Sequence, residues 1–444
     1  MHGEDKPSSG VDAARTVTLA GPGRVSGTIR VPGDKSISHR ALLLAGLAEG
    51  TSVITGLSGG DDVRRTRLAL EAYGVAIEQA DEAGRAGLLV HGGLRDEPDE
   101  PLDLGNSGTA MRLLSGVCAG VDGFAVLTGD KYLRARPMDR VATPLRAMGA
   151  AIDGRKRGLL APLGIRGGGL TGIEYDSPVA SAQVKSAILL AGLSASGRTT
   201  VREPVATRRH TEEMLADFGV AVEVDGTRVT VERARLVGTK VDVPGDPSQA
   251  AFWIVAGLIV PGGSVAVENV YLGYGRTGFV DVLRRMGGAV DVDPALRVIQ
   301  AEHGALRGIE IGPGEIPSII DEVPILAAAA TAATGTTIIE GAGELRVKES
   351  DRIKSTVRML RAFGAQATET EDGMVIEGGA ELRGATIDSH GDHRIAMAAC
   401  VLALAATGDT VIHGWDSVAT SYPGFAATVD RVTGGVVRLT AVDA

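Results

Sequence analysis

The chain has 444 residues, a length typical of about two or three domains, and a formal net charge of −10. Hydrophobic residues make up 44% of it and aromatic residues only 3%, which predicts cores built from Ala, Val, Leu and Ile. No apolar run reaches the roughly 18 residues that a membrane-spanning helix needs. The acidic charge argues against a general nucleic-acid-binding protein, so we expect neither nucleic acid nor membrane as a partner.

Six repeats of one plan fill the chain, with a period of roughly 70 residues. Each repeat begins with a polar phrase and an apolar helix, passes through a small-residue turn into a strand, and continues with an amphipathic segment, a glycine and a second strand. The turn glycines are Gly50, Gly123, Gly197, Gly263, Gly335 and Gly408. The later glycines are Gly74, Gly149, Gly219, Gly287, Gly364 and, in a less regular repeat, Gly434. Each repeat is therefore expected to form a complete supersecondary unit.

The six apolar helices are predicted to begin where polar phrases end. Their expected starts lie near Ser38, Thr109, Ala182, Ser248, Val323 and His393. A helix start carries unpaired N–H groups and about half a positive charge. If one repeat rule brings these starts to a common surface, they would favour phosphates and carboxylates, especially beside Lys and Arg.

Two phrases, IRVPGDKS at 29–36 and VDVPGDPS at 241–248, share VPGD followed by a helix start. We interpret them as a two-strand hinge, so that the strands before residue 34 belong with the C-terminal half. The expected domains are lobe I, residues 1–33 plus 246–444, and lobe II, residues 34–245. Each lobe would hold three repeats, with the active site between the lobes.

The N-terminus and the cysteines bear on the cellular location. Residues 1–15 are polar, contain no apolar stretch for a signal peptide, and are predicted to form a disordered tail. Cys118 and Cys400 are the only cysteines and lie in apolar helical text. Two cysteines within apolar helix sequences favour buried free thiols in a reducing cytoplasm.

The first helix start, GDKSISHR, places Lys35, Ser36 and Arg40 around one loop-to-helix junction. Arg40 lies about one turn beyond Ser36 and can point back toward it. Singly, a Lys or an Arg is more often a solvated surface charge, but beside a helix start these residues suit a phosphate or a carboxylate. The GxxxxGK[ST] spacing of a nucleotide P-loop is absent.

Lobe II contains three more candidate segments. In LGNSGTAMR, Gly108 allows backbone amides to approach a ligand, although a capped tight turn is the simpler interpretation. In LRARPMDR, one of three arginines could clamp a carboxylate bidentately. The next segments are SPVASAQVK and TRRHTEEML. In TRRHTEEML, a ligand contact and a solvated charged face are equal alternatives. The polar residues of these segments are Asn106, Thr109, Arg112, Arg134, Arg136, Arg140, Ser181, Gln183, Arg208, Arg209 and His210.

The C-terminal half carries the most reactive set. In IIDEVPILAAAA, Asp321 and Glu322 could cap the next helix or supply a general base. In LRVKESDRIK, Lys348 and Arg352 are four residues apart and share a helix face if the helix has begun, with Glu349 available to neutralise them. SHGDHRIAM adds a further set of polar side chains, His390, Asp392, His393 and Arg394. The histidines lack an HExxH arrangement, so no metal site is expected.

These segments closely resemble those of the 5-enolpyruvylshikimate-3-phosphate synthases, also called 3-phosphoshikimate 1-carboxyvinyltransferases. The matching phrases are GDKSISHR, LGNSGTAMR, RPM, ASAQVKSA, IDEVPILA, LRVKESDR and DHRIAM, and the likeness spans about residues 16–440. The resemblance implies a mixed α and β fold, a two-lobed α/β prism of six βαβαββ units with three per lobe. It also implies transfer of the enolpyruvyl group of phosphoenolpyruvate to the 5-hydroxyl of shikimate 3-phosphate, without metal or organic cofactor.

The resemblance assigns roles residue by residue. Lys35 would donate a proton to phosphoenolpyruvate, Asp321 would be the base for the attacking hydroxyl, and Glu349 would move protons at the methylene carbon. The residues expected to bind phosphoenolpyruvate are Lys35, Gly108, Arg136, Gln183, Arg352 and Arg394. The residues expected to bind shikimate 3-phosphate are Lys35, Ser36, Arg40, Ser181, Ala182, Gln183, Arg208, Asp321 and Lys348. We expect a cytoplasmic monomer.

Two alternatives stay open. Enolpyruvyl transferases that act on UDP-N-acetylglucosamine share the fold and usually carry a cysteine in the loop that corresponds to 128–137, which has none here. A non-catalytic phosphate-binding scaffold would keep the cations but need neither Asp321 nor Glu349.

Within the family, glyphosate-tolerant members of the branch that this chain resembles have Ala at the Gly108 position, so Gly108 predicts sensitivity to glyphosate.

Overall fold

The computed structural model describes residues 11–82, 84–94, 97–435 and 437–442. Its backbone contacts divide the chain into two compact units. Unit 1 combines the N-terminal segment up to Pro32 with Pro244–Ala444, and unit 2 is Gly33–Val243. Each unit contains three four-stranded sheets. The predicted mixed fold of six repeated units, three in each half, is therefore confirmed.

The three sheets of unit 2 share one topology, in which a parallel pair of strands is extended by two antiparallel strands. In spatial order, the first is β14 (Lys240–Asp242), β3 (Thr51–Thr55), β5 (Arg85–His91) and β4 (Ala76–Glu82). The second is β6 (Leu102–Asp103), β7 (Gly123–Thr128), β9 (Leu160–Gly167) and β8 (Ala151–Gly154). The third is β10 (Glu174–Asp176), β11 (Thr199–Arg202), β13 (Arg228–Val231) and β12 (Glu223–Asp225).

Unit 1 repeats this topology three times. Its first sheet is β2 (Ser26–Arg30), β15 (Ser264–Glu268), β17 (Val298–Glu302) and β16 (Ala289–Asp293). Its second is β19 (Glu310–Ile311), β21 (Thr336–Ile339), β23 (Met374–Glu377) and β22 (Gln366–Glu369). Its third is β24 (Thr386–Asp388), β25 (Gly408–His413), β1 (Thr16–Gly21) and β26 (Thr440–Ala441), so the N-terminal strand completes the last repeat. A two-stranded pair joins β18 (Leu306–Arg307) and β20 (Ala333–Thr334).

Each sheet is accompanied by one apolar and one amphipathic helix. The apolar helices are α1 (Lys35–Leu47), α3 (Gly108–Gly120) and α6 (Ala182–Gly192) in unit 2, and α8 (Pro247–Ile259), α11 (Val323–Thr331) and α13 (His393–Ala405) in unit 1. The amphipathic helices are α2 (Asp61–Ala72), α4 (Asp139–Ala147), α7 (His210–Asp217), α9 (Gly278–Arg285), α12 (Arg352–Ala362) and α14 (Phe425–Val432). Short turns are η1 (Leu133–Ala135), α5 (Arg155–Gly158), α10 (Ile316–Ile319), η2 (Gly343–Val347) and η3 (Trp415–Thr420).

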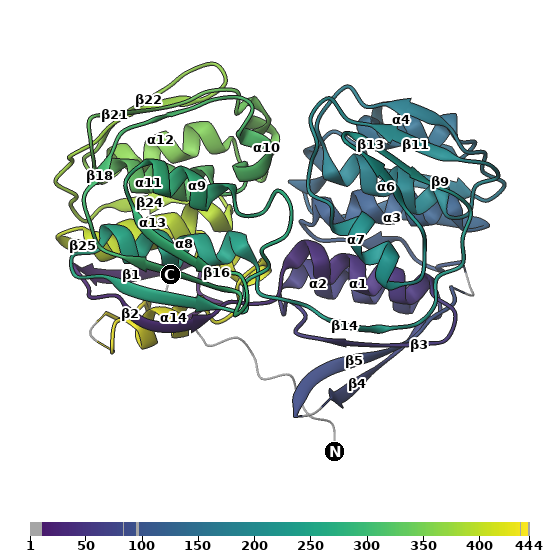
Figure 1. The fold of residues 1–444 in the computed structure, drawn as a ribbon, viewed down its shortest axis with the longest axis horizontal. Helices are drawn as coiled ribbons and strands as arrows, with labels where there is room; N and C mark the ends of the chain where they lie inside the picture. The colour runs from purple at the N-terminus through teal and green to yellow at the C-terminus, as the bar shows by residue number, and fades with distance from the viewer. Residues whose placement is uncertain (1–10, 83, 95–96, 436, 443–444) are drawn as a thin grey trace. The chain divides into compact units, whose positions relative to one another are not determined.

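The apolar helices form the core of each unit. Every residue of α8 and of α11 is buried, as expected for helices that are apolar all round. In unit 1, α8, α11 and α13 contact one another and lie inside the strands that surround them (Figure 1). Both Cys118 and Cys400 are buried thiols, as predicted. In the described part of the chain no helix has the length and apolar character that crossing a bilayer requires.

The two strands that connect the units, β2 and β14, each pair with a strand of a different repeat from the one that they lead into. Strand β2 leads into α1, yet it pairs in parallel with β15, the strand that follows α8. Strand β14 leads into α8, yet it pairs in parallel with β3, the strand that follows α1. At Gly33 an added Cβ would lie 1.9 Å from the Gly56 carbonyl oxygen, so this connection has room only for glycine.

Three details differ from the sequence predictions. The expected disordered tail is wrong for residues 11–15, because Asp12 is buried and its Oδ2 accepts a hydrogen bond of 2.8 Å from the Gly424 amide; residues 1–10 lie outside the described residues. In the fourth repeat, Gly262 rather than Gly263 has positive φ (70°). The Gly434 repeat is regular after all, since Gly434 has positive φ like its five counterparts.

Candidate active site

Within each unit, hydrogen bonds link the starts of the apolar helices. Five of these six helices begin with a side chain that accepts a backbone N–H bond, namely those of Asp34, Ser107, Ser181, Asp246 and Asp392. Such caps satisfy some of the donors left open at a helix start. The exception is α11, where Glu322 occupies the cap position without capping. Of the two roles suggested for Glu322, helix capping is therefore wrong.

In unit 2, the α1 start holds Lys35 and a buried histidine. Lys35 Nζ donates to Asp62 Oδ2 at 3.0 Å, and both side chains are mostly buried. His39 lies on the same helix, with Nδ1 2.7 Å from Thr66 Oγ1. Burial lowers the pKa of His39 well below its ordinary value, and the charges of Lys35 and Arg40 lower it further. His39 is therefore a neutral connector between α1 and α2, which the sequence analysis did not identify.

Arg40 points back to Ser36, as predicted, and is almost fully buried. Its Nη1 donates to the Ser36 carbonyl oxygen at 2.9 Å. Its Nε donates to Thr211 Oγ1 at 2.7 Å and its Nη2 to Ser186 Oγ at 2.6 Å. Arg40 thus ties the start of α1 to α6 and α7 through the hydroxyls of Ser186 and Thr211.

The start of α3 brings Gly108 against two arginines. Arg136 Nη1 donates to the Asn106 carbonyl oxygen at 3.2 Å and Nη2 donates to the Asn106 side chain. A Cβ added at Gly108 would lie 2.9 Å from Arg136 Nη1 and 3.2 Å from Arg112 Nη1. The missing side chain therefore lets the guanidinium groups reach the helix start.

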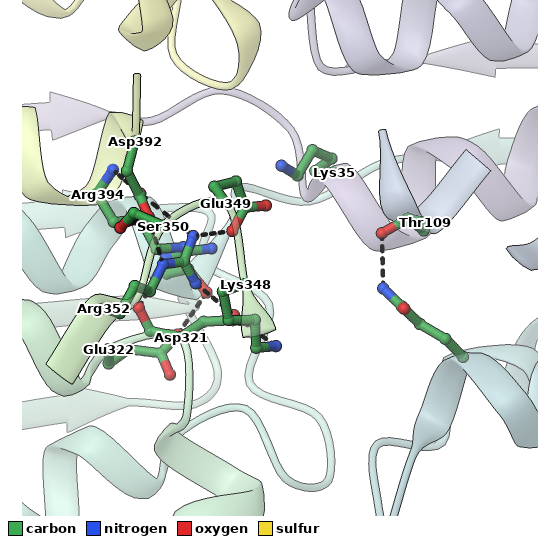
Figure 2. Close-up of polar contacts among 12 residues, drawn as sticks. Lys35, Thr109, Asp321, Glu322, Lys348, Glu349, Ser350, Arg352, Asp392 and Arg394 are labelled. Carbon is green, nitrogen blue, oxygen red and sulfur yellow. Dashed lines mark hydrogen bonds and ion pairs between the residues drawn. The ribbon is translucent and has the colours of Figure 1, made fainter. Parts of the chain in front are cut away.

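Gln183 connects α6 to α3. Its Nε2 donates to Thr109 Oγ1 at 2.9 Å, the bond drawn at the right of Figure 2, and its Oε1 accepts from Arg112 Nη1 at 2.5 Å. Ser181 caps α6 by accepting from the Val184 amide at 3.4 Å. The predicted phrases of α3 and α6 are thus brought into direct contact.

The other predicted cations of unit 2 differ in burial. Of the three arginines around Pro137, Arg136 is buried, Arg140 is partly buried and Arg134 is exposed. Arg208 and Arg209 are partly buried and immediately precede α7. Burial and proximity to Gly108 make Arg136 the strongest candidate for a carboxylate clamp among them.

Unit 2 also contains a buried ionic group that the sequence analysis missed. Lys185 Nζ lies 2.8 Å from Glu203 Oε2 and 2.7 Å from Glu212 Oε1, and all three side chains are no more than 3% exposed. Glu203 also accepts from Thr207, both from the hydroxyl at 2.6 Å and from the amide at 3.3 Å. The triad holds the segment that carries Arg208 against α6.

In unit 1, Arg352 is surrounded by three carboxylates (Figure 2). Its Nε donates to Asp392 Oδ2 at 2.9 Å, its Nη1 lies 3.5 Å from Asp321 Oδ1, and its Nη2 donates to Glu349. Burial alone would lower the pKa of Arg352, but the carboxylates, Asp392 first, raise it above its ordinary value. A permanent buried cation therefore orients the two predicted catalytic carboxylates of this unit.

Lys348 and Arg352 do not share a helix face, because the condition for it, a helix that has begun by Lys348, is not met. Asp351 caps α12, which begins only at Arg352, whereas Lys348 follows the short η2 turn. Lys348 Nζ lies 3.7 Å from Asp321 Oδ1. Burial lowers the pKa of Lys348, and the carboxylates of Asp321 and Glu349 offset this only in part.

Arg394 supports the same carboxylate from the backbone side. Its Nη1 donates to the Asp321 carbonyl oxygen at 3.0 Å. Asp392, at the cap of α13, accepts from the Arg394 amide at 3.0 Å and from Ser350 Oγ at 3.0 Å. The predicted residues of unit 1, Asp321, Lys348, Glu349, Arg352 and Arg394, thus form one connected polar group.

A second buried network in unit 1 was not predicted. Arg276 Nη2 donates to Asp246 Oδ1 at 2.7 Å, and Nη1 donates to Ser248 Oγ at 3.2 Å. Ser248 Oγ in turn donates to Glu322. The signal available in the sequence was an arginine between a strand and a helix in GYGRTG, but its partners lie on distant segments.

The chemistry available differs between the units. Unit 2 offers cations, hydroxyls and amides at its helix starts, which are donors suited to phosphate and carboxylate oxygens. Unit 1 offers carboxylates held beside arginines and a lysine, which suits proton transfer at a charged substrate. Among the residues that the structure describes, no group of three or more His, Cys, Asp or Glu is placed to hold a metal ion.

Comparison with known proteins agrees with this geometry. The model of the family described as EPSP synthase (3-phosphoshikimate 1-carboxyvinyltransferase) matches residues 19–429. A 3-phosphoshikimate 1-carboxyvinyltransferase of Synechococcus sp. (strain JA-3-3Ab) is 48% identical over 431 residues, covering 95% of this chain and 97% of that protein.

Solved structures give the same result. The EPSP synthase of Acinetobacter baumannii superposes with a TM-score of 0.83 at 41% identity, over 96% of this chain and 99% of that one. The enolpyruvyl transferase NikO from Streptomyces tendae, at 18% identity and a TM-score of 0.78, covers 97% of this chain and 100% of its own and shares the fold. The chain belongs to the EPSP synthase (3-phosphoshikimate 1-carboxyvinyltransferase) family.

Proposed function

We propose that this enzyme transfers the enolpyruvyl group of phosphoenolpyruvate to the 5-hydroxyl of shikimate 3-phosphate and releases phosphate, as a step of aromatic amino-acid biosynthesis. Family membership supports this assignment over nearly the whole chain. The observation that carries the chemistry is the Asp321 carboxylate, about 19% exposed, with Arg352 Nη1 at 3.5 Å and Lys348 Nζ at 3.7 Å. A partly exposed base beside two cations suits an anionic substrate that must lose a proton.

The reaction would proceed by addition and elimination. Asp321 accepts the proton of the 5-hydroxyl while the hydroxyl oxygen bonds to C2 of phosphoenolpyruvate. A proton is delivered to C3 by Lys35 or Glu349. The tetrahedral intermediate then loses phosphate: the bond between C2 and the phosphate oxygen breaks, and a proton leaves C3. General acid and base assistance contributes about 10²- to 10⁴-fold in rate.

Each unit supplies part of the binding. In unit 2 the residues assigned to shikimate 3-phosphate are Lys35, Ser36, Arg40, Ser181, Ala182, Gln183 and Arg208, and those assigned to phosphoenolpyruvate are Lys35, Gly108, Arg136 and Gln183. In unit 1 Asp321 and Lys348 are assigned to shikimate 3-phosphate, and Arg352 and Arg394 to phosphoenolpyruvate. Arg40 Nε and Nη2 donate to the hydroxyls of Thr211 and Ser186, so these residues would orient the guanidinium toward the ligand that it contacts.

The assay is direct. The protein is mixed with phosphoenolpyruvate and shikimate 3-phosphate, and free phosphate is followed with time. We expect release only when both substrates are present. Absence of release, together with release when UDP-N-acetylglucosamine replaces shikimate 3-phosphate, would replace this assignment with the sister activity.

A binding scaffold without catalysis is tested by a double substitution, Asp321→Asn with Glu349→Gln. In a scaffold, ligand binding would persist and there would be no turnover to lose. In the proposed enzyme, shikimate 3-phosphate still binds, while phosphate release falls by about 10²-fold or more.

We also infer a cytoplasmic monomer that binds neither nucleic acid nor membranes. The net charge of −10 supports the absence of nucleic-acid binding, and the two free buried thiols are compatible with a reducing compartment. Light scattering of the purified protein gives the test, with a mass near 45.6 kDa expected.

A further inference from the structure

We propose that Arg276 is a positioning residue for the reaction: by holding the buried Glu322 through Ser248, it fixes the direction of the neighbouring Asp321 carboxylate. This inference rests on the proposed function, in which Asp321 is the base. Arg276 is 2% exposed and belongs to the loop that precedes α9. It is outside the group around Arg352 and has no role assigned above.

The contacts of Arg276 join the starts of two helices. Its Nη2 lies 2.7 Å from Asp246 Oδ1, which also caps α8 by accepting from the Ser248 amide at 2.8 Å. Its Nη1 donates to Ser248 Oγ at 3.2 Å, and this hydroxyl passes the link on by donating to Glu322 Oε1. The direct Nη1–Glu322 Oε1 distance is 4.0 Å. Ser248 therefore relays the position of Arg276 to the start of α11.

The charges in this network cannot be satisfied by solvent. The side chains of Arg276, Asp246 and Glu322 are 2%, 5% and 1% exposed. Glu322 Oε2 has no hydrogen-bond partner among the described residues. A buried carboxylate needs a counter-charge and hydrogen bonds, so the relay through Ser248 is the constraint that keeps Glu322 in place.

Asp321 and Glu322 are consecutive residues whose carboxylates take opposite environments. Asp321 is about 19% exposed and faces Lys348 and Arg352, whereas Glu322 is buried toward Ser248. Because the two residues share a peptide unit, a backbone movement that accompanies the release of the Glu322 side chain would also turn the carboxylate of Asp321. The shared peptide is held at both ends, since Arg394 Nη1 donates to the Asp321 carbonyl oxygen at 3.0 Å and the Glu322 amide donates to the Ile319 carbonyl oxygen at 2.8 Å. The Arg276 relay adds the restraint on the Glu322 side chain that these backbone bonds do not supply.

The test uses four proteins besides wild type: Arg276→Met, Glu322→Gln, the double variant Arg276→Met with Glu322→Gln, and Arg285→Met as a control. Arg285 is the matched arginine, because it lies on α9 and its side chain is 43% exposed in an ion pair with Glu315. Phosphate release gives kcat and both KM values at each pH, and calorimetric binding of shikimate 3-phosphate gives the folded, binding-competent fraction.

We expect Arg276→Met to lower kcat per binding-competent molecule by roughly 10- to 100-fold, the scale of a small misplacement of a reacting group, while both KM values change less than about threefold. The acid limb of kcat should move to higher pH, because the uncompensated Glu322 carboxylate then lies beside Asp321 and favours its protonated form. The double variant, from which both charges are gone, should recover most of the kcat and the original limb.

Three outcomes would overturn the proposal. Arg276→Met could retain the wild-type kcat and pH profile, its loss could lie wholly in the binding-competent fraction, or the double variant could be no more active than Arg276→Met. If Arg276→Met fails to fold, the charge-balanced double variant carries the decision through its kcat. Failure of the proposed function is separate, because wild-type protein would then release no phosphate from the two substrates.

Discussion

The two units follow one plan of sheets and helices, but the arginines at their helix starts have different partners. In unit 2, Arg40 donates to two hydroxyls and a carbonyl oxygen, and Arg136 donates to Asn106. In unit 1, Arg352 and Arg276 are each bound to carboxylates. Hydroxyl and carbonyl oxygens fix the direction of the unit 2 guanidinium groups, whereas the unit 1 arginines orient the carboxylates that they hold. In the proposed function, the same fold therefore supplies donors for anionic ligands in one unit and positioned carboxylates in the other.

The largest effect should come from the partly exposed Asp321 carboxylate of unit 1. Asp321→Asn keeps the size of the side chain but removes the base, so kcat is expected to fall by about 10²- to 10⁴-fold. Binding of shikimate 3-phosphate, measured by calorimetry, should change far less, because the binding residues of unit 2 are untouched. The exposed Asp291→Asn on β16 is the control and should leave kcat unchanged. A kcat within tenfold of wild type for Asp321→Asn would contradict the division of roles.

A buried charge that has no assigned role in the reaction should affect stability more than kcat. Lys185→Met leaves Glu203 and Glu212 buried without their cation, so the free energy of unfolding should fall by about 3–5 kcal/mol. Denaturant titration measures this loss, and kcat per folded molecule should stay near the wild-type value. The triple variant with Glu203→Gln and Glu212→Gln should recover much of the stability. A loss of kcat in folded Lys185→Met would show that the triad also serves the site.

Gly108→Ala tests how closely the unit 2 arginines approach a helix start. The added Cβ would lie 2.9 Å from Arg136 Nη1, at the flexible end of that side chain, so the guanidinium should shift by a few tenths of an ångström. We expect KM for phosphoenolpyruvate to rise about tenfold and glyphosate inhibition to weaken more strongly. Gly304→Ala is the control, because no atom lies within 4 Å of its added Cβ. Wild-type turnover that is unchanged in millimolar glyphosate would contradict the predicted sensitivity.

The sequence could predict the helix starts because their signals are local. Glycines, cap residues and apolar runs place all six apolar helices. The polar segments before them contain the site residues of α1, α3, α6, α11 and α13. The remaining site residues lie at or just before the starts of amphipathic helices: Arg136, Arg208, Lys348, Glu349 and Arg352. The start of α12 has a local signal too, because Asp351 is a cap residue whose side chain accepts from the Lys354 amide at 3.1 Å. Lys185 lies in the mostly apolar helix sequence SAQVKSAILL, which indicates that its ammonium group needs buried partners. The sequence does not indicate which residues these partners are.

Pairings over long sequence separations could not be predicted from one chain. Arg276 and Glu322 are brought together only by the packing of α8 against α11, and Asp12 meets the Gly424 amide only because β1 completes the last sheet. These contacts involve side chains that look like ordinary surface charges in the sequence. Buried charges of this kind become recognisable only when burial and partner are both known.

The smallest effect concerns the pH range of the unit 1 lysine. Burial lowers the pKa of Lys348, so this group loses its proton at a lower pH than an ordinary lysine does. The protonated form is present below that pKa and disappears as the pH rises through it. KM for shikimate 3-phosphate should therefore increase on the alkaline side in wild type. Lys348→Arg keeps its charge, so its KM should stay flat to higher pH, with a change of about threefold or less near pH 7.

The measurement is KM for shikimate 3-phosphate between about pH 7 and 10, with Lys354→Arg on the exposed face of α12 as the matched control. The control should follow the wild-type curve, because Lys354 lies outside the group around Arg352. An alkaline rise that persists unchanged in Lys348→Arg would assign the titration to another group and remove Lys348 from substrate binding. A rise that disappears would mean that unit 1 also contributes a titrating cation to the ligand, which limits the separation between an anion-binding unit and a proton-transfer unit.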